Sequence, residues 1–524
     1  MRFSNAALLV LGVVVFVSVA PVAGAGWEES VDALVVATDD GERASAMGKV
    51  LAQAPSWQEV ARRLESAAFA APELVGQPIL RSAVCIDTVE RPWVLLVPPD
   101  YDPSVPTPLL VVLHGGVGAA EVNDDPVGDV LENELGALAL ERGWIALFPF
   151  GQAGATWWDE VGMANISDLV RTVKRELNAD DDRVWMAGFS DGASAGFAHA
   201  MLAPSDYAAF VALNGHMGVA SLDGDLPTYA PNMAATPIFA TTTFDDGLYP
   251  SHKMRSSIEM ARESGADIYY REFPGEHDFD DVESELPAIA RFLERHPRDP
   301  LPSRIVWEAG STDFGECRWL AIDRITTDEP SPWHGDHNVA LMDDRITIGF
   351  QPDYDFEGSG IRVGVLSDDD YPARNIGLVA GDVIVKADDA RMDSLPDLDE
   401  WKATVERGDR FEMTVLRDGE RVVLGGALPE PAGHFIFKRD VPSAAVRADF
   451  AANRLEVTTS RVGSFRVLVH PDMVALDRSL VIVADGEVVF DELVEPDLEF
   501  LLNNYLDNRD RSLLYVAEVV VELE

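Results

Sequence analysis

The stretch VWMAGFSDGASAG, residues 184–196, decides the fold of the largest part of the chain. It begins with an unbroken apolar run and ends in a segment rich in alanine. Between the two, residues 188–192 fit the pattern G-x-S-x-G, which places a serine on a sharp turn between a buried strand and a helix. Because so short a pattern also arises by chance, its meaning depends on the strands around Ser190 and on the partner residues that follow it.

Strand-like and helix-like segments alternate from about residue 83 to residue 296. The strand-like segments are continuous apolar runs, which are typical of strands buried on both faces. The helical stretch 166–177 carries apolar residues at every third or fourth position, as one buried helix face does. This alternation predicts an α/β domain in which helices cover both sides of a mostly parallel sheet. The expected strands are residues 109–113, 144–148, 184–187, 207–213, 237–243 and 268–273.

A serine hydroxyl attacks poorly unless a base takes its proton, an acid orients the base, and N–H donors stabilise the oxyanion. The chain offers serine, acid and histidine in that order. Asp246 lies in FDDGLYP, residues 244–250, and His277 lies in PGEHDF, residues 274–279, and each follows a predicted strand. The carboxyl ends of parallel strands share one edge of a sheet, so we expect Ser190, Asp246 and His277 to meet there.

Four motifs in this order carry a resemblance to a known family. Together they make residues 83–300 similar to the α/β-hydrolases, in particular to the secreted esterases of the polyhydroxybutyrate-depolymerase-like and feruloyl-esterase-like kinds. The resemblance implies the α/β-hydrolase fold for this catalytic domain. The motifs are LHGG at 113–116, GFSDG at 188–192, D-x-x-Y-P at 246–250 and G-x-H at 275–277.

The resemblance also implies a role for each motif residue. Ser190 is the nucleophile, His277 is the general base and then the general acid, and Asp246 is the orienting acid. Asp246 is favoured over Asp245 because Asp246 keeps the family's spacing to Tyr-Pro. Backbone N–H groups of Gly116 and Asp191 form the oxyanion hole.

Two further features concern the surroundings of this site. Trp157 and Trp158 follow the strand that ends at residue 148, where they line a substrate pocket or, as an equal alternative, pack in the core. No His, Cys, Asp or Glu cluster has the spacing of a metal site, so we expect neither a metal nor another cofactor.

Residues 345–428 carry a different signature. The run GLVAGDVI, residues 377–384, and the strand-like segments around it resemble a PDZ domain of the bacterial secreted-protease type. This resemblance implies that Ile348, Gly349 and Phe350 offer backbone N–H groups to the C-terminal carboxylate of a peptide. The acidic stretch 353–357 departs from the pattern where a carboxylate would approach. The alternative is a PDZ fold that serves only as a spacer.

The segments on either side of the PDZ region are rich in predicted strands. Two strands alone are not a stable unit, so residues 303–340 and 430–524 are expected to form one discontinuous β-sandwich-like domain. The PDZ domain is then an insertion in it. The predicted fold class is therefore α/β, an α/β-hydrolase domain followed by a β-sandwich with an inserted PDZ domain.

Composition and the first residues bear on partners and location. The net charge is −49, from 90 acidic against 41 basic residues, which disfavours nucleic acid and anionic membranes as partners. Residues 1–25 read as a cleaved secretory signal peptide, with an uncleaved anchor as the alternative, and 26–82 read as a helical segment. A secreted or periplasmic protein without a membrane span is expected. Whether Cys85 and Cys317 pair is left open.

These observations predict an exported serine hydrolase that cleaves carboxylic esters, with an ester substrate that is free or part of a polymer. Two alternatives stay open. One is a serine peptidase similar to prolyl oligopeptidases. The other is a non-catalytic hydrolase fold whose active part is the PDZ domain. The sequence does not specify the acyl group, the alcohol or the oligomeric state.

Overall fold

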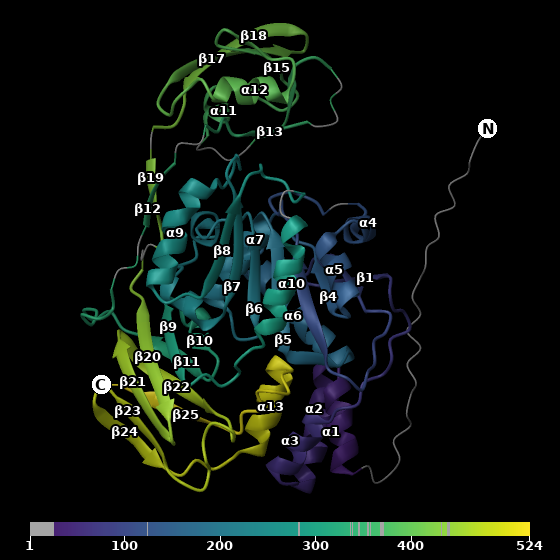
Figure 1. The fold of residues 1–524 in the computed structure, drawn as a ribbon, viewed down its shortest axis with the longest axis vertical. Helices are drawn as coiled ribbons and strands as arrows, with labels where there is room; N and C mark the ends of the chain where they lie inside the picture. Colours follow the sequence, from purple (N-terminus) through teal and green to yellow (C-terminus); the bar gives the residue numbers. More distant parts are fainter. Residues whose placement is uncertain are drawn as a thin grey trace, which may run out of the picture.

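The computed structural model describes residues 26–524 except 123, 281–282, 336, 338, 344–345, 354–355, 357, 367–370, 431, 438–440 and 524. The predicted signal peptide, residues 1–25, lies outside the described residues. The centre of the structure is a sheet with eight strands among the described residues, which we call the main sheet (Figure 1). These strands are β1 (Pro78–Val84), β2 (Glu90–Leu96), β3 (Thr107–Leu113), β4 (Ile145–Pro149), β5 (Ala179–Phe189), β6 (Ala209–Leu213), β7 (Ile238–Thr243) and β8 (Ile268–Phe273).

The main sheet has the strand order β1-β2-β4-β3-β5-β6-β7-β8. Strands β3 to β8 run parallel, while β1 and β2 are antiparallel to their neighbours, which is the α/β-hydrolase topology. The register aligns Leu113 with Gly188 and Leu213 with Thr241. The loops that leave β3, β5, β6 and β7 therefore emerge at one edge of the sheet.

Helices cover both faces of the main sheet, because each parallel strand is apolar on both sides. Buried residues of α6, α7 and α9 form one core cluster with the sheet, and those of α4, α5 and α10 form the cluster on the other face. The predicted face of 166–177 is buried, Ile166 at 0% exposure and Leu169 at 2%. The helices are α4 (Pro126–Leu131), α5 (Glu134–Arg142), α6 (Glu160–Glu176), α7 (Asp191–Leu202), α9 (Ser251–Glu263) and α10 (Leu286–Arg295).

A β-rich domain follows the main sheet, and it is built from two distant parts of the chain. Strand β9 pairs with β20, and β11 pairs with β22, so segments before and after the PDZ region share sheets. The two sheets have the orders β10-β11-β22-β25 and β24-β23-β21-β20-β9. This confirms the predicted fold class. The strands are β9 (Arg304–Ala309), β10 (Glu316–Cys317), β11 (Leu320–Ile325), β20 (Ala444–Ala451), β21 (Arg454–Ser460), β22 (Val462–Val469), β23 (Leu480–Ala484), β24 (Glu487–Glu492) and β25 (Ala517–Glu522).

The amino-terminal helices belong to the core of this β-rich domain. Buried residues of α1 (Trp27–Val36), α2 (Asp40–Gln53) and α3 (Trp57–Glu65) share one cluster with Trp307, Trp319 and the rest of that core. The carbonyls of Leu34 and Val35 accept hydrogen bonds from Arg509, which caps α13 (Leu498–Asn508). The helices end well before residue 82, and residues 78–84 form β1 of the main sheet rather than part of a helical segment.

The PDZ region stands apart from the body at the top of Figure 1. Its sheet has the order β13-β14-β15-β17-β18, with β16 paired to β15. A two-stranded antiparallel arm of β12 (Val339–Asp343) and β19 (Ala432–Ile436) connects it to the rest. The two strands of this arm pair with each other and not with the two sheets of the β-rich domain. The β-rich domain was predicted to extend to residue 340 and to resume at residue 430, so these predicted boundaries differ from the structure. The PDZ elements are β13 (Phe350–Pro352), β14 (Ile361–Leu366), α11 (Pro372–Asn375), β15 (Val383–Ala387), β16 (Ala390–Arg391), α12 (Leu395–Lys402), β17 (Arg410–Arg417) and β18 (Glu420–Ala427).

A buried ion cluster joins the β-rich domain to the main sheet at the edge opposite Ser190. The Nζ of Lys174, on α6, lies 3.3 Å from Asp181 and 3.6 Å from Asp510. Arg298 contacts the same Asp510 at 2.6 Å. Burial acts to lower the pKa of Lys174, but Asp510, Asp206 and Asp181 outweigh it and raise the pKa. Lys174 is therefore charged in the interior.

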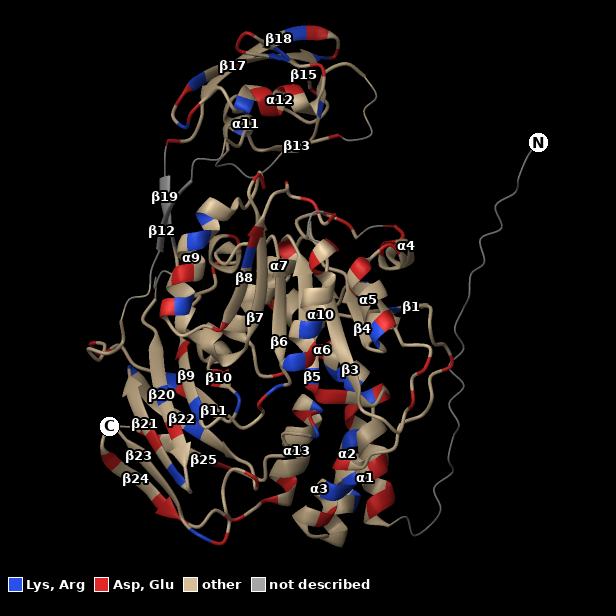
Figure 2. Cartoon of the chain, in the orientation of Figure 1, with Lys and Arg blue, Asp and Glu red and all other residues tan. Residues whose placement is uncertain are grey.

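Acidic residues are spread over the helices, the β-rich domain and the PDZ region (Figure 2). Cys85 and Cys317 are both buried free thiols and do not form a disulfide. Within the described part of the chain, no helix is long and apolar enough to cross a membrane.

Candidate active site

The turn that carries Ser190 is strained. Ser190 has φ 58° and ψ −118° between the end of β5 and the start of α7, a conformation that costs a non-glycine residue about 1–3 kcal/mol. A Cβ on Gly192 would collide with the carbonyl oxygen of Leu113 on the neighbouring strand, so the last glycine of G-x-S-x-G lets α7 approach β3. The turn points Ser190 out at the carboxyl edge of the main sheet.

Ser190, His277 and Asp246 form a chain of hydrogen bonds at this edge. The Oγ of Ser190 lies 2.8 Å from Nε2 of His277, and Nδ1 of His277 lies 2.8 Å from Oδ2 of Asp246. A carboxylate only accepts, so Nδ1 carries the hydrogen and Nε2 is left to accept the serine hydroxyl. The structure thus brings together the three residues that the sequence placed at three strand ends.

Asp246 is held as a carboxylate by several donors. Its side chain is fully buried, and Oδ1 accepts from the backbone N–H groups of Leu248 and Tyr249 at 2.8 and 2.7 Å. Burial acts to raise the pKa of Asp246, but the hydrogen bonds from His277 and these N–H groups outweigh it and lower the pKa below 3.8. Asp246 is therefore ionised at neutral pH and fixes the orientation of His277.

Asn214, in the loop after β6, is a further support for Asp246. Its Nδ2 donates to Oδ2 of Asp246 at 3.3 Å and to Oγ1 of Thr243 at 2.8 Å, while its Oδ1 accepts from Thr241. Asn214 is fully buried and has φ 53°, a region in which asparagine is several-fold enriched. Sequence reasoning missed this residue. The Asn-Gly pair directly after a buried strand is the signal that could have drawn attention to it.

The loop after β3 lies against Ser190, and residues 114–117 are called the oxyanion loop below. A Cβ added to Gly115 would lie 3.0 Å from Cβ and 3.4 Å from Oγ of Ser190, so only glycine fits comfortably. Oδ2 of Asp191 accepts from the N–H of Val117 at 3.0 Å and ties the loop to α7. Asp191 is the first residue of α7, where helix geometry provides no i−4 acceptor for its N–H. Gly116, with φ +71°, lies between these two contacts.

His114 shapes the oxyanion loop through its ring. Nε2 accepts from the N–H of Gly151 at 3.0 Å, so Nδ1 carries the hydrogen and donates to the carbonyl of Gly115 at 2.7 Å. Burial lowers the pKa of His114 below 6.5, against the opposing effects of Gly115 and Asp129, and the ring is neutral at pH 7. Trp157, at 0% exposure, donates from Nε1 to the carbonyl of His114 at 2.9 Å.

Trp157 and Trp158 are core residues in this structure. Trp158 is 5% exposed and belongs with Trp157 to the cluster that packs on the main sheet. Of the two predicted alternatives, the burial favours core packing over a substrate pocket. The reason is that Trp157 bonds to the oxyanion loop, while Trp158 lies against Gly224, just after α8 (Val219–Leu222), where a Cβ would come within 2.7 Å of its ring.

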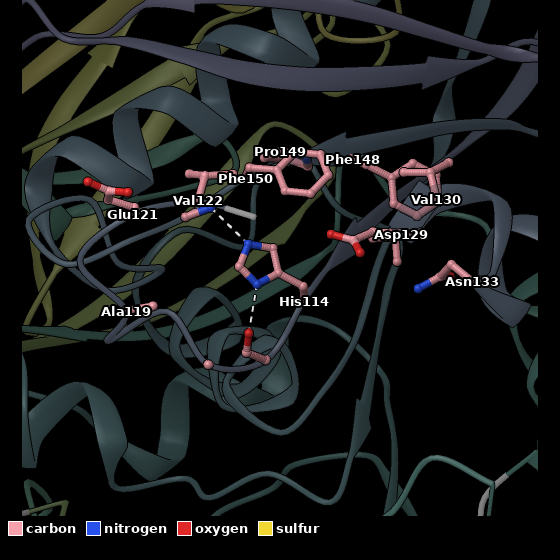
Figure 3. Close-up of a pocket in the computed structure, with 14 residues that line it drawn as sticks. His114, Ala119, Glu121, Val122, Asp129, Val130, Asn133, Phe148, Pro149 and Phe150 are labelled. Atoms are coloured by element: carbon pink, nitrogen blue, oxygen red, sulfur yellow. Dashed lines mark hydrogen bonds between the residues drawn. The ribbon is translucent and has the colours of Figure 1, made fainter. Parts of the chain in front are cut away.

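A cavity of about 390 Å³ lies beside the oxyanion loop. Figure 3 shows the ring of His114 in it, with Asp129 on one side, Glu121 on the other and Phe148 and Phe150 along one wall. Gly115 and Gly116 line this cavity as well. The cavity is therefore adjacent to the position of Ser190.

In the PDZ region, the predicted carboxylate-binding residues lie at the start of the first strand. Ile348 is buried, its carbonyl accepts from Ala373, and Gly349 has φ +93° beside Tyr371. Phe350 opens β13, which pairs with β14 on one side and is an edge strand among the described strands. The loop is thus next to a sheet edge, which is where a peptide adds as a strand in other PDZ domains.

Comparison with known proteins finds sequence similarity in two parts of the chain. Residues 345–424 match the family model of the PDZ domain. A stretch of 89 residues is 32% identical to the bifunctional acetylxylan esterase/xylanase XynS20E of Neocallimastix patriciarum. That match covers 16% of this chain and 12% of XynS20E. The likeness therefore concerns a small part of either protein.

Solved structures with a similar arrangement are distant in sequence. A thermostable esterase is 20% identical, with 43% of this chain and 64% of its own covered and a TM-score of 0.36. A ferulic acid esterase is 14% identical, with 42% and 99% covered and a TM-score of 0.36. A fluorophosphonate-binding serine hydrolase of Staphylococcus aureus is 14% identical, with 42% and 98% covered and a TM-score of 0.34. The chain spans less than two thirds of the length of XynS20E and of the thermostable esterase.

Proposed function

We propose that this protein is an exported serine hydrolase that cleaves carboxylic esters through an acyl-enzyme on Ser190. The observation that carries the proposal is the hydrogen-bonded chain from Ser190 through His277 to Asp246, with 2.8 Å at each step. The strained turn at Ser190 supports it, because strain of this kind concentrates at functional sites.

The proposed reaction has two halves. In the first, His277 takes the proton of Ser190 as the hydroxyl attacks the ester carbonyl carbon, and the oxyanion is stabilised by the N–H groups of Gly116 and Asp191. The C–O bond then breaks, and the alcohol leaves with the proton from His277. In the second half, His277 activates water, which attacks the acyl-enzyme and releases the acid and Ser190. Asp246 stabilises the charged imidazole in both halves.

The test is the intact mass of the purified protein after exposure to a fluorophosphonate. Wild type and Ser256→Ala are expected to gain one adduct, while Ser190→Ala gains none. Ser256 is the matched control because its hydroxyl bonds to the carbonyl of Lys253 on α9 and is not part of the chain of hydrogen bonds at Ser190. A folded wild type that gains no adduct would contradict the proposal and favour the non-catalytic scaffold.

Ester and amide substrates of the same acyl group separate the esterase from the peptidase alternative. We expect Ser190-dependent cleavage of the p-nitrophenyl ester and little cleavage of the matched p-nitroanilide. Efficient cleavage of the anilide, or of internal peptides, would favour a peptidase. Export is tested separately: the amino terminus of the protein recovered outside the cytoplasm is expected at Gly26, after the signal Ala23-Gly24-Ala25.

The PDZ region is proposed to hold the enzyme at a protein or polymer by binding a peptide carboxyl terminus. The edge position of β13 and the loop at Ile348 and Gly349 support this proposal. A fluorescent peptide with a free, apolar carboxyl terminus should bind the full-length protein, and its C-terminal amide should not. If neither peptide binds, or both bind equally, the spacer alternative is favoured.

A further inference from the structure

The cavity beside the oxyanion loop shares a wall with the candidate active site. Gly115 lies against Ser190, and it also lines the cavity together with Gly116. An ester whose carbonyl carbon meets Ser190 has its carbonyl oxygen near Gly116, so one of its two moieties can extend past this loop. The cavity volume of about 390 Å³ falls in the range of small-molecule sites, which is roughly 300–1,000 Å³.

The inner walls of this cavity are apolar and aromatic. Phe148 and Phe150 are each 5% exposed and Val130 is 3% exposed, and Val122 completes the wall. Figure 3 shows the aromatic rings grouped above the His114 ring. A group bound in the cavity would therefore lose contact with water and lie against aliphatic and aromatic side chains.

The charged groups of the cavity are all of one sign. Glu121 and Asp129 contribute carboxylates at its exposed side, and among the described residues that line it there is no Lys or Arg. His114 supplies no positive charge, because both ring nitrogens have backbone partners and its pKa is lowered. A moiety with a carboxylate would meet two groups of its own sign, whereas a cation would meet two carboxylates and two aromatic rings.

We propose that this cavity is a subsite for a moiety of the ester that carries an ammonium group. Aromatic faces attract a cation, and this attraction grows as water is excluded. The two carboxylates add Coulombic attraction from the other side. The proposal rests on the proposed esterase function, and it names a substrate class for that site: small esters of ammonium-bearing alcohols or acids.

Two isosteric pairs of esters test the charge alone. Acetylcholine is compared with 3,3-dimethylbutyl acetate, which replaces the nitrogen of the alcohol by carbon. Ethyl betaine is compared with ethyl 3,3-dimethylbutanoate, which does the same in the acyl group. Each kcat/KM is divided by the rate constant for hydroxide-catalysed hydrolysis, so that the intrinsic reactivity of the ester cancels. We expect about a tenfold preference for the ammonium ester in one pair at physiological salt, the size of a partly desolvated cation–aromatic contact.

Variants and salt then assign the preference to this cavity. Glu121→Gln/Asp129→Asn should lower the preference, because only the aromatic contact then remains. Glu132→Gln, which changes an exposed carboxylate on the same segment that does not line the cavity, should leave the preference at the wild-type value. For wild type, raising the salt concentration to 1 M should also lower the preference, because the exposed carboxylates are screened. The salt series needs no mutation and decides the matter if the double variant does not fold.

The outcomes separate the two proposals. If neutral esters are cleaved in a Ser190-dependent way but neither ammonium ester is preferred, the subsite is overturned and the esterase stands. A preference that the double variant and 1 M salt both leave unchanged also overturns it, since the carboxylates of this cavity then contribute nothing. If no ester is cleaved by Ser190, both proposals fall.

Discussion

Ile436 lies against Gly218, although the PDZ region lies between these two residues in the sequence. A Cβ on Gly218 would meet Cγ1 of Ile436 at 3.2 Å. The same Cβ would lie 2.9 Å from the ring of His216, and that ring is 5.5 Å from the ring of Tyr249. Tyr249 is in turn 5.8 Å from the ring of His277. The end of the PDZ arm is thus in a continuous line of contacts with the candidate base.

Phe437→Ala tests whether the arm is anchored through this contact. Phe437 is 1% exposed and, with Ile436, belongs to the core cluster of the main sheet. Removing the ring should leave a cavity and lower the free energy of unfolding by about 3–5 kcal/mol. Calorimetry should show a lower melting temperature for the hydrolase domain, and esterase activity should fall at 37 °C. Val441→Ala, at a side chain that is 45% exposed, is the control and should change stability by less than about 0.5 kcal/mol.

Asn214→Ala should lower kcat with little change in KM. It removes a donor to the Asp246 carboxylate, and a hydrogen bond to a charged group is worth about 1.5–3 kcal/mol, so the expected loss is about tenfold or more. The pKa of Asp246 should rise, and the acid side of the pH–kcat profile should move to higher pH. Asn232→Ala is the matched control, because Asn232 is also fully buried but bonds to Met201 and Glu308. If both variants lower kcat equally and neither shifts the profile, Asn214 is merely structural.

His199 should make the stability fall between neutral and acid pH. It is buried at 1% exposure, and burial lowers its pKa from 6.5 to about 4. The unfolded chain binds a proton as pH falls through 6.5 and the folded protein does not until about pH 4, so acid favours unfolding over this window. The full effect is at most about 3 kcal/mol. His199→Gln should flatten the fall in melting temperature from pH 7 to pH 5, whereas His252→Gln, at an exposed histidine, should not; equal slopes for all three proteins would refute the assignment.

Lys174→Met should destabilise the attachment of the β-rich domain to the main sheet. The variant leaves the carboxylates of Asp181 and Asp510 buried with one partner fewer, which costs about 3–5 kcal/mol. Because the side chain of Lys174 is fully buried, this loss should hardly depend on salt. Arg171→Met, which breaks an exposed pair with Asp168 on the same helix, should cost less than about 1 kcal/mol. Chemical denaturation at low and high salt measures both variants.

Local patterns predicted the part of the site that a single segment encodes. The turn at Ser190 is encoded by a strand, two glycines and a helix within 13 residues. Because parallel strands end at one edge of the sheet, the sequence also predicted that Asp246 and His277 would lie at the same edge. Asn214 escaped this reasoning because Asn-Gly also marks ordinary turns, and only the fold shows that its amide meets Asp246.

Contacts between distant segments were also beyond the sequence patterns. Ile436 and Phe437 read as part of a strand in the sandwich, yet they pack in the core of the main sheet because the arm returns past the loop after β6. The ion cluster joins Lys174 to Asp510 across more than half of the chain, and each of these residues by itself reads as a solvated charge. Spatial proximity of this kind depends on the relative placement of whole domains.

The pairing of β9 with β20 and of β11 with β22 has a consequence for folding during synthesis on the ribosome. Residues 304–325 leave the ribosome well before their partners at 444–469 exist, and at about 5–20 residues per second the wait is on the order of ten seconds. Through this interval the apolar strands have an open edge on which another chain can pair, and the amino-terminal helices lack much of the core against which they pack. The PDZ insertion thus lengthens the time during which a nascent chain can aggregate through its open strand edge. Chaperones that shield strand edges should therefore matter more to the folding of this protein than to that of a hydrolase domain synthesised alone.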